Sequence, residues 1–108
     1  MNSAQEIIKN SILKLEGVSA HPHRFGGIEF KLGKRELGHI HGNKLVDIPF
    51  PKKVKDELIK EGKAKAHHVL PESGWISFYI KSDEDIYRAI ELLKKSYSLA
   101  VNKFGIKH

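Results

Sequence analysis

The chain has 108 residues, of which 40% are hydrophobic and 30% charged, which fits one soluble globular domain over residues 1–108 and excludes a disordered chain. It has no cysteine, which excludes disulfides, thiolate metal sites and cysteine nucleophiles, and no apolar run approaches the roughly 18 residues of a membrane span. The net charge of +6 favours anionic partners, although lysines also serve solubility. We expect a cytoplasmic protein without membrane contact, and the single glutamine beside many Lys and Glu suits a heat-adapted source.

The chain opens with a predicted helix and a short extended segment. Residues 3–6 (Ser-Ala-Gln-Glu) form a capping box, and apolar residues at three- and four-residue spacing predict a helix with one buried face as far as Glu16, before Gly17. Residues 18–25 are predicted to be extended. Because Pro22 removes a backbone donor, an edge position in a sheet is favoured for this segment.

Residues 28–48 predict a three-stranded antiparallel meander. Apolar and charged residues alternate along its first strand, Gly33-Lys34 suits a two-residue hairpin turn, and Gly42-Asn43 suits a second one. This register pairs Lys31 with Glu36, which carry opposite charges. The predicted core face comprises Ile28, Phe30, Leu32, Leu37, His39, His41, Val46 and Ile48.

The same register has consequences for three polar residues. His39 would face the core, and His41 would lie near its rim. Asp47 would lie on the opposite face from His39. This arrangement counts against a histidine–aspartate pair, unless a β-bulge shifts the pairing of the strands.

The second half of the chain predicts a helix, a strand and a longer helix. Pro51 is well placed to open the first helix, whose outer face is basic and includes Lys55. Residues 66–74 are expected to form a loop or irregular strand. Residues 75–80 (Trp-Ile-Ser-Phe-Tyr-Ile) give the strongest strand pattern, with bulky side chains on both faces. Ser82 caps a final helix of about 22 residues, long enough to cross the sheet.

The predicted order of elements is therefore α-β-β-β-α-β-α. Strands joined by tight turns pair antiparallel, and amphipathic helices bury one face against a sheet. We predict an α+β two-layer sandwich, with an antiparallel sheet of four to five strands and the helices on one face.

Several stretches resemble the family known as the luciferase domain, and the resemblance extends from about Gly17 to Tyr97. It implies a small α+β domain from a family without an established biochemical activity, and the family's label does not imply light emission here. The chain also resembles, more distantly, the YjbR-like proteins, which have a frataxin-like α+β sandwich and some of which are labelled DNA-binding. The resemblance to the luciferase domain is carried by residues 21–27 (HPHRFGG), 36–42 (ELGHIHG), 45–51 (LVDIPFP), 67–75 (HHVLPESGW) and 92–97 (LLKKSY).

Six of the seven histidines form three close pairs along the chain. A His-x-His pair on a strand places both rings on one face, as zinc and iron sites require, so His39 and His41 are candidate metal ligands. A divalent metal is not the favoured occupant, because the spacing lacks the framework of a named metal motif. The alternative is a structural role, with His39 as a hydrogen-bonded core residue. The three pairs are His21 and His23, His39 and His41, and His67 and His68.

Catalysis is a second use of these residues. His39 and His41 could transfer protons near neutral pH, with Asp47 tuning them, in a hydrolase or isomerase that works with or without a divalent metal. The chain has no Gly-x-Ser-x-Gly nucleophile motif.

Anion binding is a third use. Arg24 offers a bidentate fork for carboxylate or phosphate, and the glycines that follow it free backbone amides to approach an anion. His67, His68 and Trp75 would complete this ligand-binding set. A small anionic molecule bound at this His/Arg/Asp-rich site is the leading expectation for the function of the domain.

Nucleic acid is a further candidate partner. The lysines of residues 52–65 could follow a phosphate backbone, and Trp75 and Tyr79 could stack on bases. Acidic residues interrupt this basic run, however, and such a mixture is typical of a solvated helix face. A weak nucleic-acid or protein-interaction module therefore remains as an alternative, and the sequence leaves the oligomeric state open.

Overall fold

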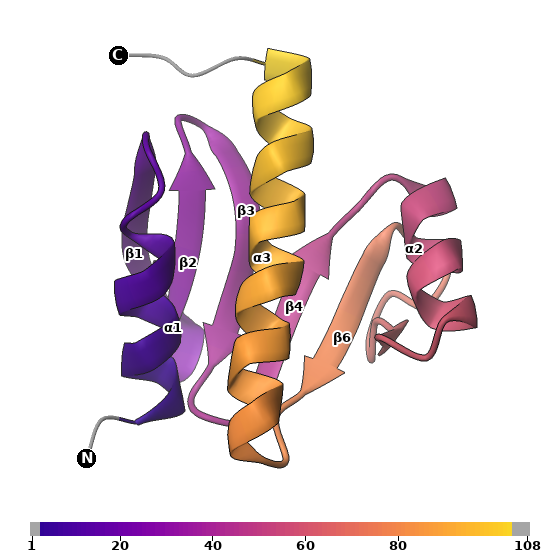
Figure 1. Cartoon of the computed structure of the whole chain (residues 1–108), viewed down its shortest axis with the longest axis horizontal. Coiled ribbons are helices and arrows are strands. Elements are labelled where there is room, and N and C mark those ends of the chain that lie inside the picture. The colour runs from indigo at the N-terminus through magenta and orange to yellow at the C-terminus, as the bar shows by residue number, and fades with distance from the viewer. Residues whose placement is uncertain (1–2, 105–108) are drawn as a thin grey trace.

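The computed structural model describes residues 3–104, which form one sheet with three α-helices packed around it (Figure 1). The strand order is β1-β2-β3-β4-β6-β5, and every neighbouring pair is antiparallel. The elements in chain order are α1 (Ala4–Ile12), β1 (Val18–His23), the 3-10 helix η1 (Arg24–Gly26), β2 (Gly27–Leu32), β3 (Arg35–His41), β4 (Leu45–Pro49), α2 (Lys52–Lys60), β5 (Lys65–Ala66), β6 (Trp75–Tyr79) and α3 (Asp83–Phe104).

This arrangement confirms the predicted α+β class and its antiparallel sheet. The sheet has six strands, whereas the sequence predicted four to five. β1 is the expected edge strand, and the additional strand is β5, only two residues long. α1 ends at Ile12, earlier than expected, because the chain continues in turns to Gly17, which has a φ of 85°.

The hydrophobic core lies between the sheet and the helices α1 and α3, which lie side by side over one face (Figure 1). α3 crosses β3 and β4, and its first turn is capped by Ser82, whose hydroxyl accepts a hydrogen bond from the Asp85 amide at 3.4 Å. α2 packs against β5 and β6 at the far end of the sheet. No helix within residues 3–104 is both long enough and apolar enough to cross a membrane.

A β-bulge in β3 changes the predicted register. Lys31 pairs with Glu36 as expected, but Phe30 pairs with Gly38, so that Leu37 is an extra residue on β3. Both Leu37 and Gly38 are buried, and a Cβ on Gly38 would lie 2.8 Å from Leu93 Cδ2 of α3. The close packing of α3 on this part of β3 therefore requires the bulge with glycine at its second position.

The turn after β3 is also longer by one residue than expected. His41 pairs with Leu45, which leaves three residues in the turn, and His39 pairs with Asp47. The bulge turns His39 and His41 away from the core, which corrects the predicted core position of both residues. The bulge and the longer turn each shift the register by one residue, and the two shifts cancel on β4. Val46 therefore still faces the core, as predicted.

As a result, His39 and Asp47 lie on the same face of the sheet, and the prediction that they lie on opposite faces is wrong. The face turned away from α3 carries one continuous polar row that crosses all six strands. Cross-strand pairing links its members in the order His21, Glu29, His39, Asp47, Ser77 and Lys65.

The basic face of α2 also differs from expectation. Lys55 is only 4% exposed, and its ammonium group donates hydrogen bonds to the carbonyl oxygens of Pro71 at 2.6 Å and Ser73 at 2.7 Å. This lysine therefore does not belong to the solvent-exposed basic face that the sequence predicted for residues 52–65.

Candidate functional site

Asp47 lies at the centre of the polar row and is only 1% exposed. The hydroxyl of Ser77 on β6 donates a hydrogen bond to Asp47 Oδ1 at 2.8 Å, and it accepts one from the backbone N–H of His68 at 3.2 Å. The hydroxyl hydrogen is therefore directed at Asp47. This contact fixes the carboxylate and leaves Oδ2 facing the remaining partners.

Four imidazole nitrogens surround this one oxygen. The Nε2 atoms closest to Asp47 Oδ2 belong to His41, at 3.0 Å, and His68, at 3.1 Å. The Nε2 atoms of His39 and His67 follow at 3.3 and 3.4 Å. A carboxylate oxygen has two lone pairs for hydrogen bonds, so it cannot accept a full hydrogen bond from each of four rings. We call these five side chains the Asp47 cluster.

His67 has a fixed tautomer. Its Nδ1 accepts hydrogen bonds from the backbone N–H groups of Val69, at 3.1 Å, and Leu70, at 3.0 Å. Nδ1 therefore carries no proton, and Nε2 carries the proton that points at Asp47. Burial lowers the pKa of His67, and Coulombic interactions with His68 and His39 lower it further against the opposing effect of Asp47, which favours the neutral ring. His67 is thus a donor to Asp47 and cannot offer Nε2 as a metal ligand.

His39 bridges two carboxylates. Its Nδ1 lies 2.6 Å from Glu36 Oε2, and its Nε2 lies 3.3 Å from Asp47 Oδ2. Burial disfavours a charged ring, but the hydrogen bonds to Asp47 and Glu36 outweigh burial and raise the pKa of His39 to about 9. The ring is stacked on His23, with centroids 4.2 Å apart, and lies 5.3 Å from Trp75. These contacts fix the orientation of a positively charged imidazole.

His41 and His68 are the two members of the Asp47 cluster that face solvent. Their side chains are 32% and 37% exposed, and their only described hydrogen bonds through the ring are those of Nε2 to Asp47. Nothing described fixes their tautomers, so either ring can carry its proton on Nδ1 and present a lone pair at Nε2. Ligand atoms of His41, Asp47 and His68 all lie within 4.8 Å of one another; a second group of this kind comprises His23, His39 and His41.

The charges around Asp47 do not balance. Burial would raise the pKa of Asp47, but hydrogen bonds with His39, His68 and Ser77 outweigh burial and hold this pKa well below its usual range. In the form in which His41, His67 and His68 are neutral, Asp47 and Glu36 carry two negative charges against the single positive charge of His39. One buried negative charge is left, which favours a cation at this position.

The cluster contains six of the seven residues that the sequence predicted for a site, if Trp75 is included through its ring contact with His39. The seventh, Arg24, lies exposed in η1, and no hydrogen bond or ion pair described for residues 3–104 connects it with Asp47 or the four histidines. The six are His39, His41, Asp47, His67, His68 and Trp75.

Two supporting residues, Glu36 and Ser77, were not predicted as members of a site, whereas His23 was predicted as a member of one of the three histidine pairs. Glu36 was visible in the sequence as the partner of Lys31, and Ser77 lies in the strongest strand pattern at the position that pairs with Asp47. His23 joins because β1 pairs with β2 at the edge of the sheet. His21, the other member of the same histidine pair, does not join the site. Its Nε2 atom instead lies 2.8 Å from Ser19 Oγ.

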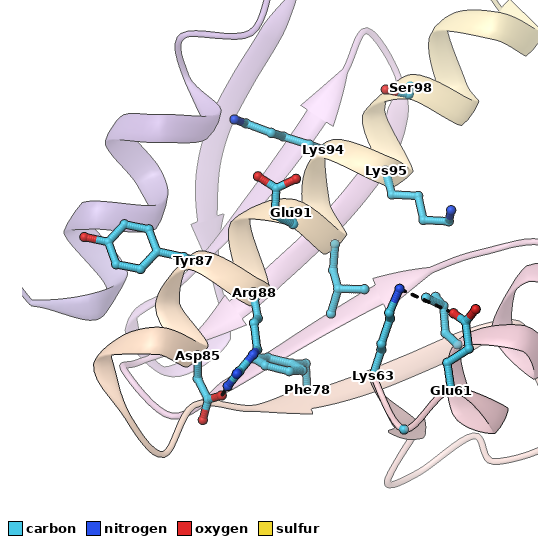
Figure 2. Close-up of a pocket in the computed structure, with 13 residues that line it drawn as sticks. Glu61, Lys63, Phe78, Asp85, Tyr87, Arg88, Glu91, Lys94, Lys95 and Ser98 are labelled. Carbon is cyan, nitrogen blue, oxygen red and sulfur yellow. Dashed lines mark hydrogen bonds and ion pairs between the residues drawn. The ribbon is translucent and has the colours of Figure 1, made fainter.

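A separate cavity of about 880 Å³ lies between α2 and α3 on the helical side of the sheet (Figure 2). Its charged lining is largely paired, since Lys63 contacts Glu61 at 3.5 Å and Arg88 contacts Asp85 at 2.9 Å. None of the residues of the Asp47 cluster line this cavity, which is therefore not part of the same site.

Comparison with known proteins gives one match. The family model described as the luciferase domain matches residues 34–96, more than half of the chain. The matched region includes the whole Asp47 cluster with Glu36, Trp75 and Ser77, and it begins after His23 and Arg24. No curated protein and no solved structure matched, so the more distant likeness to YjbR-like proteins stays a prediction.

Proposed function

This chain belongs to the luciferase domain family, and we propose that it binds one divalent transition-metal ion through His41, Asp47 and His68. The observation that carries this proposal is the convergence of four Nε2 atoms on a single buried carboxylate oxygen. Hydrogen bonding to that oxygen uses at most two of them. The two with free tautomers can instead direct their lone pairs at a metal ion beside Asp47 Oδ2.

The spacing of the three ligand atoms supports this reading. Two ligands bound about 2.0–2.1 Å from one ion lie about 2.9 Å apart at a right angle and about 3.4 Å apart at the tetrahedral angle. The distances from Asp47 Oδ2 to His41 Nε2 and to His68 Nε2, 3.0 and 3.1 Å, lie between these values. Each histidine thus lies at the distance from Asp47 Oδ2 that a shared ion requires, and the three ligand atoms all lie within 4.8 Å of one another.

The surroundings of the three ligands also suit a metal. Ser77 and His67 donate to Asp47 and hold its carboxylate, while Glu36 orients His39 against the same oxygen. The unbalanced negative charge attracts a cation. Two imidazole nitrogens and one carboxylate oxygen are a ligand set typical of Zn²⁺, Fe²⁺ and related ions.

Three protein ligands leave at least one coordination position for another molecule. The exposed sides of His41 and His68 direct that position toward solvent. A bound divalent ion changes the net charge around Asp47 from negative to positive, and so it favours a small anionic ligand with an oxygen donor. We therefore propose that the expected small anion binds to the metal ion, without a contribution from Arg24.

The direct test is isothermal titration of metal-free protein with Zn²⁺. We expect one Zn²⁺ per chain, and we expect His41→Ala and His68→Ala each to remove this binding while the far-UV circular dichroism stays unchanged. His21→Ala is the matched control, because His21 is exposed and lies outside the cluster. Binding that survives in both His41→Ala and His68→Ala would overturn the proposal.

A metal-dependent hydrolase is a second candidate, favoured by the same open position. A metal ion with three protein ligands lowers the pKa of bound water to about 7 and makes it a nucleophile. Zn²⁺-loaded protein should then hydrolyse an activated ester such as p-nitrophenyl acetate faster than the His68→Ala variant does. Equal rates for the two proteins would leave metal-dependent ligand binding without catalysis.

A further inference from the structure

A lysine on a different element holds the segment that carries two of the cluster's histidines. Residues 67–74 contain His67 and His68 and connect β5 to β6. Lys55 of α2 lies 4% exposed beneath this segment and donates to the carbonyl oxygens of Pro71 and Ser73, at 2.6 and 2.7 Å. Two short, charge-assisted hydrogen bonds from one ammonium group therefore fix the middle of the segment.

The position of Lys55 is locally unfavourable. It lies in the first turn of α2, where the helix dipole disfavours a positive charge and where no acidic residue is present. Burial of an ammonium group also costs free energy unless it is well paired. Residues that break local rules in this way commonly serve a site elsewhere in the structure.

Other hydrogen bonds of residues 67–74 connect the part of the segment that Lys55 contacts with the site. The Gly74 carbonyl accepts a hydrogen bond from the Phe50 amide at 3.2 Å, just before α2, and a Cβ on Gly74 would lie 2.0 Å from the Phe50 oxygen. Ser73 Oγ donates to the Leu70 carbonyl at 2.7 Å. The Leu70 amide in turn donates to His67 Nδ1. A series of hydrogen bonds through Ser73 and Leu70 thus connects Lys55 with the ring of His67, the residue next to His68.

We propose that Lys55 is the positioning residue of the metal site: it holds residues 67–74 so that His68 meets His41 and Asp47 at the distance that one ion requires. This inference rests on the proposed metal-binding function. Lys55 does not contact the ion itself. It acts by stabilising the binding-competent arrangement of the segment before the ion binds, which lowers the free-energy cost of ordering the segment on binding.

The test compares Zn²⁺ affinity in metal-free protein carrying Lys55→Met, Lys55→Arg or Lys53→Met. We expect Lys55→Met to weaken Zn²⁺ binding 10- to 100-fold, the usual effect of losing a supporting contact at a metal site. Lys55→Arg, which can still donate to both carbonyls, should recover part of the affinity. Lys53→Met is the control, because Lys53 is exposed on the same helix.

Two spectroscopic measurements separate positioning from general stability. Co²⁺ bound to Lys55→Met should show an altered d–d absorption spectrum, because the three ligands meet it in a changed geometry. In the unmodified protein, Zn²⁺ should slow amide exchange at Leu70 and Ser73, since the segment and the ion stabilise each other. This second measurement also tests the inference if Lys55→Met does not fold.

The outcomes distinguish the two proposals. The role of Lys55 would be overturned if Lys55→Met bound Zn²⁺ with an affinity within threefold of the unmodified protein. It would also be overturned if Zn²⁺ left amide exchange at Leu70 and Ser73 unchanged. In either case, loss of binding in His68→Ala would still support the metal site. Unchanged binding in both His41→Ala and His68→Ala would instead remove the metal site, and the inference about Lys55 with it.

Discussion

Replacing Asp47 by Asn should destabilise the metal-free protein by about 3 kcal/mol, since Asp47 is the charged centre of the site. The substitution keeps the size of the side chain, and Oδ1 can still accept the hydrogen bond from Ser77. It removes the charge-assisted hydrogen bonds that Oδ2 accepts from the surrounding rings, at most two at a time and each worth about 1.5–3 kcal/mol. The loss of these hydrogen bonds is offset in part because the variant no longer buries a negative charge. The net destabilisation, about 3 kcal/mol, is therefore near the lower end of the range for breaking a buried ion pair.

The assay is urea unfolding at pH 7 with a metal chelator, followed by circular dichroism. With an m-value of about 1–3 kcal/mol per molar, the expected loss lowers the midpoint by roughly 1–3 M. Asp56→Asn is the matched control, because Asp56 is exposed on α2, and its midpoint should stay within error. If the free energy of unfolding of Asp47→Asn lies within about 0.5 kcal/mol of that of the unmodified protein, the usual size of a surface effect, the hydrogen bonds to Asp47 do not hold the cluster together.

Three further predictions follow from the same contacts. The pKa of His39 is raised from 6.5 to about 9, which contributes about 3 kcal/mol to the stability of metal-free protein. This contribution is fully present below pH 6.5 and is lost as the pH rises to 9. Urea midpoints that do not fall more steeply over this range in the unmodified protein than in His39→Gln would contradict the prediction. Gly38→Ala should cost at least about 2 kcal/mol, because Gly38 has a φ of 150° and its Cβ would lie 2.8 Å from Leu93 Cδ2; an unchanged unfolding midpoint would show that the bulge tolerates a side chain. His41→Ala should change the stability of metal-free protein by less than about 1 kcal/mol, because the ring is one-third exposed and another of the four rings can take over its hydrogen bond to Asp47; collapse of the fold in this variant would mean that His41 is structural.

The element types and the core of β4 could be predicted because they depend on local patterns. The capping box, the turn at Gly33-Lys34 and the alternation from Ile28 to Leu32 are each complete within a few residues. The pair of Lys31 and Glu36 was also correct, since it lies next to the turn and before the bulge. The pattern therefore specified the strands well near the first turn, whereas the second turn has one residue more than predicted.

The site could not be assembled from the sequence, because its register depends on packing between distant elements. The bulge at Leu37 places Gly38 where any side chain would collide with Leu93, a residue of α3. Without the bulge, an ordinary register puts His39 toward the core and away from Asp47. The histidine composition indicated the chemistry of the site, but the bulge decided which side chains meet.

The segment of residues 67–74 was unpredictable for a related reason. Its approach to Asp47 depends on Lys55 and on the fit of Gly74 against Phe50, and neither contact has a sequence signature. The basic composition of α2 instead favoured an exposed face for Lys55. Binding of nucleic acid by the remaining lysines of residues 52–65 stays a prediction.

The most direct test of the metal site is a crystal structure of protein loaded with Zn²⁺, with anomalous diffraction recorded at the zinc edge. The site described above predicts a single peak about 2.0–2.2 Å from His41 Nε2, His68 Nε2 and Asp47 Oδ2, with a further position open to solvent. No peak at Asp47, or a peak bound by His23, His39 and His41 in its place, would contradict the assignment of these three ligands.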